Sequence, residues 1–213
     1  MSGDVFGYFP LTPGILGFYA ADVCGHGVRA ALSAVALAHL ITPEYFWAAV
    51  CAAPAEGNVI CTADLVEALD SRFMGSDDDN YFTLFAGALV EASDELRFCQ
   101  AGYPSPLLIR ANGVTEWVGS GGMPVGMLPN AEFECDSVTL RPGDRLVVYS
   151  DGVIEAENPQ GESFGEERLA DFVCLRPDQP ANSVLAELSA HLRNWTTNEV
   201  FADDISMILI ERE

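Results

Sequence analysis

Apolar residues follow two spacings along this chain, and each spacing predicts a different kind of element. Short apolar or alternating runs bounded by Gly, Pro, Asn or Asp predict strands, because successive side chains of a strand point to opposite faces. Longer runs with apolar residues three and four positions apart predict helices. Strands are therefore predicted over 4–11, 15–20, 81–91, 95–101, 107–110, 114–118, 134–140, 145–149 and 205–210.

Helices are predicted over 28–41, 61–73, 166–175 and 182–195. The first is apolar on all sides and is expected to be buried, while Thr62 or Asp64 is the expected cap of the second. The segment 48–57 follows neither pattern. Because the helices fall in two groups and the strands form hairpins, the sequence predicts an α+β fold with helices on antiparallel sheets. No repeat or linker divides the chain, so residues 1–213 are interpreted as one domain.

The composition is that of a folded but strongly acidic protein. Hydrophobic residues make up 49% of the 213 residues, which is enough for a substantial core. There are 32 acidic and 10 basic residues, which give a formal charge of −22. This charge argues against nucleic acid or an anionic membrane as the main partner, because both would be repelled. A solvated acidic surface accounts for most of the acidic residues.

The absence of a targeting signal and the spacing of the cysteines both bear on the cellular environment. The first residues lack the basic start and apolar run of a secretory signal, and no apolar segment is long enough to span a bilayer. A soluble, cytoplasmic protein is therefore expected. The six cysteines contain no C-x-x-C pair, so they are expected to be reduced and mostly buried rather than part of a zinc or disulfide framework. They stand at positions 24, 51, 61, 99, 135 and 174.

Short acidic motifs stand at the ends of four predicted strands, far apart in sequence. Hard cations such as Mg²⁺ and Mn²⁺ prefer carboxylate, carbonyl and water oxygens. If the fold gathers these motifs, they predict a two-metal hydrolytic site. A fifth acidic segment, 75–80, lacks the ligand spacing of an EF-hand and is interpreted as a solvated loop. The four motifs are Gly3-Asp4, Asp22 to Gly27, Ser150-Asp151-Gly152 and Asp203-Asp204.

The motifs belong to a longer ordered set that covers almost the whole chain. In order, its members are Ser2-Gly3-Asp4, Asp22-Val23-Cys24-Gly25-His26-Gly27, Phe82-Thr83-Leu84-Phe85, Ala101-Gly102-Tyr103-Pro104-Ser105-Pro106, Gly122-Met123-Pro124-Val125-Gly126, Tyr149-Ser150-Asp151-Gly152-Val153, Phe164-Gly165 and Asp203-Asp204-Ile205-Ser206. With this set the chain resembles the SpoIIE/RsbU-type branch of the metal-dependent (type 2C, PPM) serine/threonine protein phosphatases. The resemblance implies a PPM-like fold, two stacked antiparallel sheets flanked by helices.

The resemblance also implies a ligand set for two divalent cations, Mn²⁺ or Mg²⁺. Asp4 and Asp22 are the implied ligands of the dinuclear centre, with the Val23 carbonyl beside them, and Asp151 and Asp203 complete the shell of the second metal. Such cations lower the pKa of a bridging water, so that the resulting hydroxide attacks the phosphorus of a phosphoester. No protein nucleophile is required for this reaction.

Two assignments at these motifs stay open. His26 is a candidate general acid for the leaving oxygen, but it is equally explained as a residue that orients the glycine turn by hydrogen bonding. Asp204 is an alternative to Asp203 as the last ligand, although the family pattern favours the first of the pair.

The chain departs from the family pattern at several places. Cys24 stands where serine is usual, Tyr103 where many relatives carry histidine, and Gly7 where many carry a second aspartate. None of these changes removes one of the four carboxylates, so an active enzyme is expected. Relatives also carry a strand and lead-in before the first motif. We therefore expect that the chain lacks a first strand or an upstream regulatory region, such as a sensor or receiver domain.

The implied partner is a phosphorylated regulatory protein, a STAS-domain anti-anti-sigma factor, and a homodimer is a further expectation from the family. Two alternatives remain. The first is an inactive pseudo-phosphatase that serves as a binding or adaptor module in a partner-switching or two-component pathway. The second is a calcium-binding domain that keeps its carboxylates but does not turn over substrate.

Overall fold

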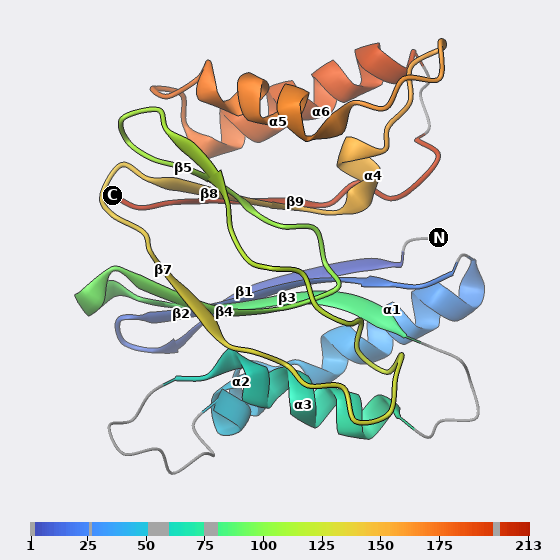
Figure 1. The fold of residues 1–213 in the computed structure, drawn as a ribbon, viewed down its shortest axis with the longest axis vertical. Helices are drawn as coiled ribbons and strands as arrows, with labels where there is room; N and C mark the ends of the chain where they lie inside the picture. The colour runs from blue at the N-terminus through green and yellow to red at the C-terminus, as the bar shows by residue number, and fades with distance from the viewer. Residues whose placement is uncertain (1–2, 26, 51–59, 75–80, 198–200) are drawn as a thin grey trace. The chain divides into compact units, whose positions relative to one another are not determined.

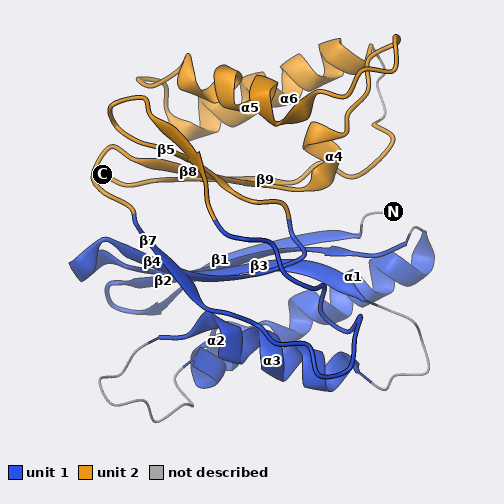
Figure 2. Cartoon of the chain, in the orientation of Figure 1, with its two compact units in different colours: residues 1–103, 119–139 blue, residues 104–118, 140–213 orange. Residues whose placement is uncertain are grey.

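The structure, a computed structural model, describes residues 3–25, 27–50, 60–74, 81–197 and 201–213. The chain forms two compact units, coloured separately in Figure 2. Unit 1 comprises residues 1–103 and 119–139, and unit 2 comprises residues 104–118 and 140–213. Across the described residues, none of the helices combines the length and apolar character that crossing a bilayer requires.

Unit 1 is a five-stranded antiparallel sheet with helices on one face (Figure 1). The strand order is β1-β2-β3-β4-β7. The strands are β1 Asp4–Thr12, β2 Ile15–Val23, β3 Phe82–Val90, β4 Glu95–Ala101 and β7 Asp136–Thr139, with a short 3₁₀ turn at Glu91–Ser93. The helices are α1 Val28–Leu40, α2 Pro43–Val50 and α3 Thr62–Phe73.

The side chains of the central strands of unit 1 point alternately to the two faces of the sheet, and both faces are apolar. Small buried residues such as Ala21 and Ala86 face the helices and allow them to lie close to the sheet. On the opposite face Phe85 stacks with Phe98, their ring centroids 5.2 Å apart. The ring of Phe18 lies where a Cβ on Gly87 would have to sit. The sheet therefore requires glycine at position 87 for steric reasons.

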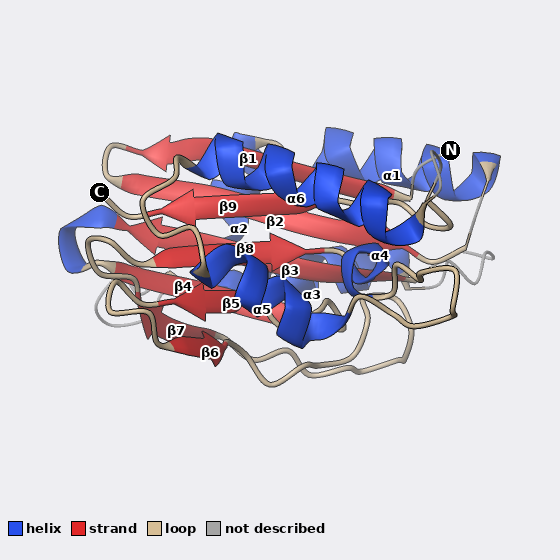
Figure 3. Cartoon of the chain, turned by 90° about the horizontal axis from the view of Figure 1, so that it is seen from above, coloured by secondary structure: helices blue, strands red, loops and turns tan. Residues whose placement is uncertain are grey.

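Unit 2 is a four-stranded antiparallel sheet, order β6-β5-β8-β9, packed against helices (Figure 3). Its core includes Val147 and Tyr149 of the sheet and Leu169, Leu188 and Leu192 of the helices. The strands are β5 Leu107–Ile109, β6 Thr115–Trp117, β8 Arg145–Tyr149 and β9 Met207–Glu211. The helices are α4 Asp151–Ile154, α5 Gly165–Cys174 and α6 Ala181–Thr196.

The strands match the sequence prediction to within a few residues, but three predictions about the helices and cysteines are wrong. Only one stripe of α1 packs on the sheet, and Leu32 on its other side is 65% exposed, so this helix is not buried all round. The N-cap of α3 is Cys61, because Thr62 already lies inside the helix. Among the described cysteines only Cys99 is buried, and Cys24 is exposed, since it follows the end of β2.

An ion pair between the half-buried Arg110 and the buried Asp144 connects two turns of unit 2. Asp144 is 2% exposed, and its carboxylate accepts hydrogen bonds from Arg110 Nη1 (2.8 Å) and from the N–H groups of Ala111 (2.9 Å) and Arg141 (3.0 Å). Burial alone would raise the pKa of Asp144, but these donors outweigh it and the pKa lies below its usual value.

We expect Asp144→Asn to lower the free energy of unfolding by about 2 kcal/mol near neutral pH, because it removes a buried charge from its partners. The pKa of Asp144 is lowered in the folded state, so its contribution is present above the ordinary pKa and is lost as the pH falls through the folded value. Urea unfolding at pH 7 and in acid measures both effects. The exposed Asp178→Asn is the control, and a deficit that is equally large in acid would contradict the assignment.

Candidate metal centre

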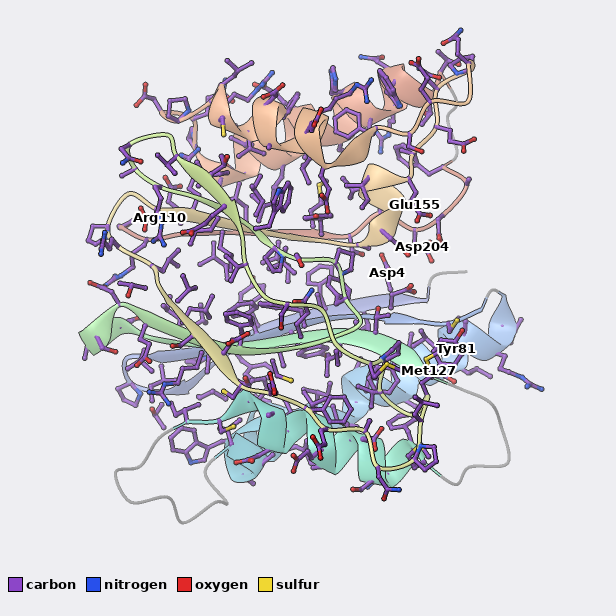
Figure 4. All side chains as sticks on the ribbon, in the orientation of Figure 1. Asp4, Tyr81, Arg110, Met127, Glu155 and Asp204 are labelled. Carbon is purple, nitrogen blue, oxygen red and sulfur yellow. The ribbon has the colours of Figure 1, made fainter. Side chains whose placement is uncertain are left out.

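Asp4 and Asp22 occupy facing positions in the first hairpin of unit 1. In the antiparallel pairing of β1 with β2, Asp4 lies opposite Asp22, and cross-strand partners point to the same face of a sheet. Both side chains are half-buried, and Figure 4 labels Asp4 at the beginning of β1. Like charges directly opposite each other are destabilising. The arrangement therefore favours binding of a cation.

An irregularity in β1 determines toward which face of the sheet the Asp4 side chain points. The register shifts between Pro10 and Thr12, so that Leu11 is an extra residue in this strand. Such a β-bulge changes the alternation of all residues beyond it. Without the bulge, Asp4 would lie opposite Val23 and would share that residue's helix-covered face. The bulge thus brings the two carboxylates to one face.

Backbone and side-chain oxygens lie close together next to Gly3. The N–H of Val23 donates a hydrogen bond to the Gly3 carbonyl (3.2 Å). A Cβ on Gly3 would lie 2.8 Å from the Val23 carbonyl oxygen and 3.2 Å from Asp22 Oδ1. A side chain at position 3 would therefore displace two of the predicted ligand atoms, and glycine leaves both of them in place.

In unit 2, Asp151 and Asp203 stand at the adjoining ends of two paired strands. Asp151 begins α4 two residues after the end of β8, and Asp203 precedes β9. The buried Ser150 connects the two segments: its hydroxyl donates to the Asp204 carbonyl (3.3 Å) and accepts from the N–H of Ser206 (3.0 Å). Sequence analysis identified the position of Ser150 but not this role, because a tie between distant segments leaves no local pattern.

The backbone at Gly152 also lies very close to the backbone of the Asp203-Asp204 segment. A Cβ on Gly152 would clash with the Asp204 carbonyl oxygen and would lie 3.5 Å from Asp203 Cβ. The N–H of Asp204 donates to Asp203 Oδ1 (2.8 Å), which orients that carboxylate. Glycine at position 152 is therefore required for the two segments to meet.

Burial and charge act together on Asp151. Its pKa is raised, first by burial and then by the negative charge of Asp203, although backbone N–H groups partly oppose the shift. A bound divalent cation would favour the ionised form instead. The pair thus carries an electrostatic strain that a cation would relieve.

Each unit brings two of the predicted aspartates together. In neither unit do the described residues gather three or more His, Cys, Asp or Glu side chains around a possible metal position. The residues present provide carboxylate and carbonyl oxygens, which suit Mg²⁺ or Mn²⁺. His26 and the acidic segment 75–80 lie outside the described residues.

Unit 2 also contains a pocket of about 610 Å³ that adjoins Asp203. Glu155, labelled in Figure 4, and Glu157 are among its lining residues, together with Phe201. Sequence analysis did not identify these residues, because acidic positions in a loop look like the rest of an acidic surface. Their charge favours cationic groups in this pocket.

Comparison with protein-family models matches residues 12–213 to Stage II sporulation protein E (SpoIIE). The chain belongs to the SpoIIE family. This finding confirms the resemblance that the ordered motifs carry, and it extends over both units of the SpoIIE-family chain.

Two curated relatives align with nearly the whole chain. Protein IcfG of a Synechocystis species is 28% identical over 231 residues, which cover 100% of this chain and 36% of that protein. Phosphoserine phosphatase RsbP of Bacillus subtilis is 24% identical over 212 residues, which cover 99% of this chain and 49% of that protein. The SpoIIE-family chain therefore spans less than half the length of these relatives.

Solved structures show the same fold. The SiaA-PP2C domain of Pseudomonas aeruginosa superposes with a TM-score of 0.79 at 20% identity, over 100% of this chain and 81% of that one. At this identity the likeness establishes the fold alone. The predicted α+β class with two antiparallel sheets is confirmed.

We expect Gly152→Ala to lower the free energy of unfolding by about 2 kcal/mol, because the added methyl group forces Asp204 and Asp203 away from α4. Urea unfolding measures the change. Asn182→Ala, at an exposed position of α6, is the control for an alanine substitution that meets no neighbour. Equal stability of Gly152→Ala and the native protein would contradict the close approach.

Proposed function

We propose that the SpoIIE-family chain is a metal-dependent protein serine/threonine phosphatase in which Asp4, Asp22, Asp151 and Asp203 hold two divalent cations, Mn²⁺ or Mg²⁺. The observation that carries the proposal is the pairing of carboxylates in each unit. Asp4 lies opposite Asp22, and Asp151 interacts with Asp203. All four aspartates belong to the ordered motifs that carry the resemblance, and three of them, Asp22, Asp151 and Asp203, lie within the residues matched to the SpoIIE family.

The chain's own groups have distinct roles in this proposal. When bound, the two cations neutralise phosphoryl oxygens and lower the pKa of the water that hydrolyses the phosphoester. Asp22 and the Val23 carbonyl supply adjacent oxygens in unit 1. The Asp204 N–H holds Asp203 in orientation, and Ser150 holds the Asp204 segment beside α4. Asp203 rather than Asp204 is the proposed ligand, because the family pattern favours the first of the pair and because the charge of Asp203 acts on Asp151.

The proposal has parts that rest on the resemblance. Residues 1–213 act as a single phosphatase domain, and the whole protein carries an upstream regulatory region. The substrate is a phosphoserine- or phosphothreonine-bearing regulatory protein, and the similarity to a phosphoserine phosphatase, RsbP, supports the phosphoserine part of this statement. A STAS-domain anti-anti-sigma factor is the substrate that the family resemblance implies. Cytoplasmic location and homodimer formation belong to the same proposal. The role of His26 as general acid stays a prediction.

We expect Asp22→Asn and Asp151→Asn each to reduce Mn²⁺-dependent phosphate release by about 100-fold or more, because each removes a charged ligand. Asp22 lies in unit 1 and Asp151 in unit 2. A loss of phosphate release in both variants would therefore indicate that both units contribute to one active site. Release is measured from p-nitrophenyl phosphate and from a phosphoserine STAS protein. Asp178→Asn, which is exposed in unit 2, is the matched control and is expected to keep full activity.

Removing and replacing the metal distinguishes a phosphatase from a calcium-binding domain and from an adaptor module. A chelator is expected to abolish release, and Mn²⁺ or Mg²⁺ to restore it. Binding of Ca²⁺ without turnover in any metal would indicate a calcium-binding domain. No turnover at millimolar Mn²⁺, together with tight binding of the phosphoserine protein, would contradict the phosphatase and indicate an adaptor module.

A further inference from the structure

Three cysteines of unit 1 converge on the helix-covered face of its sheet. Cys61 directly precedes α3, Cys99 belongs to β4, and Cys135 directly precedes β7. The ladder between β4 and β7 ends with Phe98 opposite Asp136. The next residues along these strands, Cys99 and Cys135, are therefore facing neighbours at the end of the ladder.

Hydrogen bonds hold the start of α3 beside these strands. Arg97 Nη1 donates to the Ile60 carbonyl (3.2 Å), and the Thr62 hydroxyl lies 3.7 Å from Cys135 Sγ. Residues on both sides of Cys61 are thus anchored to the neighbourhood of Cys135. Burial, and after it the neighbouring Cys135 thiol, raises the pKa of Cys61, so the two side chains are close enough to interact.

The exposure of the three thiols differs. Cys61 and Cys135 are half-buried, and a small oxidant can reach them, whereas Cys99 is fully buried. Burial raises the pKa of Cys99 to about 12, so Cys99 stays an unreactive thiol at neutral pH. The cluster therefore contains one reachable pair rather than three equivalent thiols.

We propose that Cys61 and Cys135 form an oxidisable pair that a peroxide converts into a disulfide. All described cysteines are free thiols, and the contacts of Ile60 and Thr62 on either side of Cys61 hold this residue next to Cys135. The cross-link would tie the start of α3 to the start of β7. The inference does not depend on the proposed phosphatase activity.

The reaction needs one hydrogen peroxide for each pair. The thiolate of one cysteine attacks a peroxide oxygen, an S–O bond forms, the O–O bond breaks, and the departing hydroxide takes up a proton to become water. The second sulfur then attacks the sulfenic sulfur, so that the S–S bond forms, the S–O bond breaks and a second water leaves. Two thiols lose two electrons in total, and the peroxide gains them.

Peptide mapping of the native protein tests the pair directly. The protein is treated with a small excess of hydrogen peroxide at mildly alkaline pH, where more thiolate is present, and is digested without reductant. We expect a linked pair of peptides that contain Cys61 and Cys135, with a mass two hydrogens below their sum. Dithiothreitol is expected to separate them. Sulfinic acid at these residues without a link, or links between other cysteines, would overturn the proposal.

Thermal unfolding gives a second readout. Because the cross-link closes a long loop of the unfolded chain, the Tm of the oxidised protein is expected to rise by roughly 5 °C or more. Cys61→Ser and Cys135→Ser are each expected to lose this rise. Cys174→Ser, in unit 2, and Cys51→Ser, outside the described residues, are controls that should retain it. A rise that survives in either of the first two variants would contradict the assignment.

Discussion

A single extra residue in the first strand determines where the acidic groups of unit 1 lie. Leu11 forms a bulge in β1, and the alternation of side chains beyond it places Asp4 opposite Asp22. The Leu11 side chain packs across Gly17, where a Cβ would lie 2.9 Å from Leu11 Cδ1. Small size at position 17 therefore makes room for the bulge. The facing carboxylates depend on packing at the far end of their own hairpin.

In unit 2 two carboxylates, those of Asp151 and Asp203, are also neighbours, but strand pairing does not place them. Its acidic residues lie in the segments that follow β8 and precede β9, so no strand register fixes them. The Ser150 hydroxyl and the close approach of Gly152 to the Asp204 carbonyl hold these segments together. In both units like charges are held close together, with Asp4, Asp22 and Asp151 half-buried and Asp203 exposed. In a chain of formal charge −22, this arrangement strongly favours cations over anions.

Local patterns predicted the strands well, because alternation is visible within a few residues. They missed α2, since its start at Pro43 follows α1 after a gap too short to show a new period. The motif aspartates were found by type and spacing, but the opposition of Asp4 and Asp22 was not, because a bulge leaves no sequence signal. The convergence of Cys61 with Cys135 was also missed, since it depends on contacts between residues far apart in the chain.

The central claim is that the two carboxylate pairs hold the metals of one phosphatase centre. Anomalous diffraction at the manganese absorption edge, from crystals grown with Mn²⁺, tests it most directly. We expect two peaks with carboxylate oxygens of Asp4, Asp22, Asp151 and Asp203 among their ligands, at roughly 2.0–2.3 Å. Peaks at other residues, or none at a Mn²⁺ concentration that supports turnover, would contradict the claim.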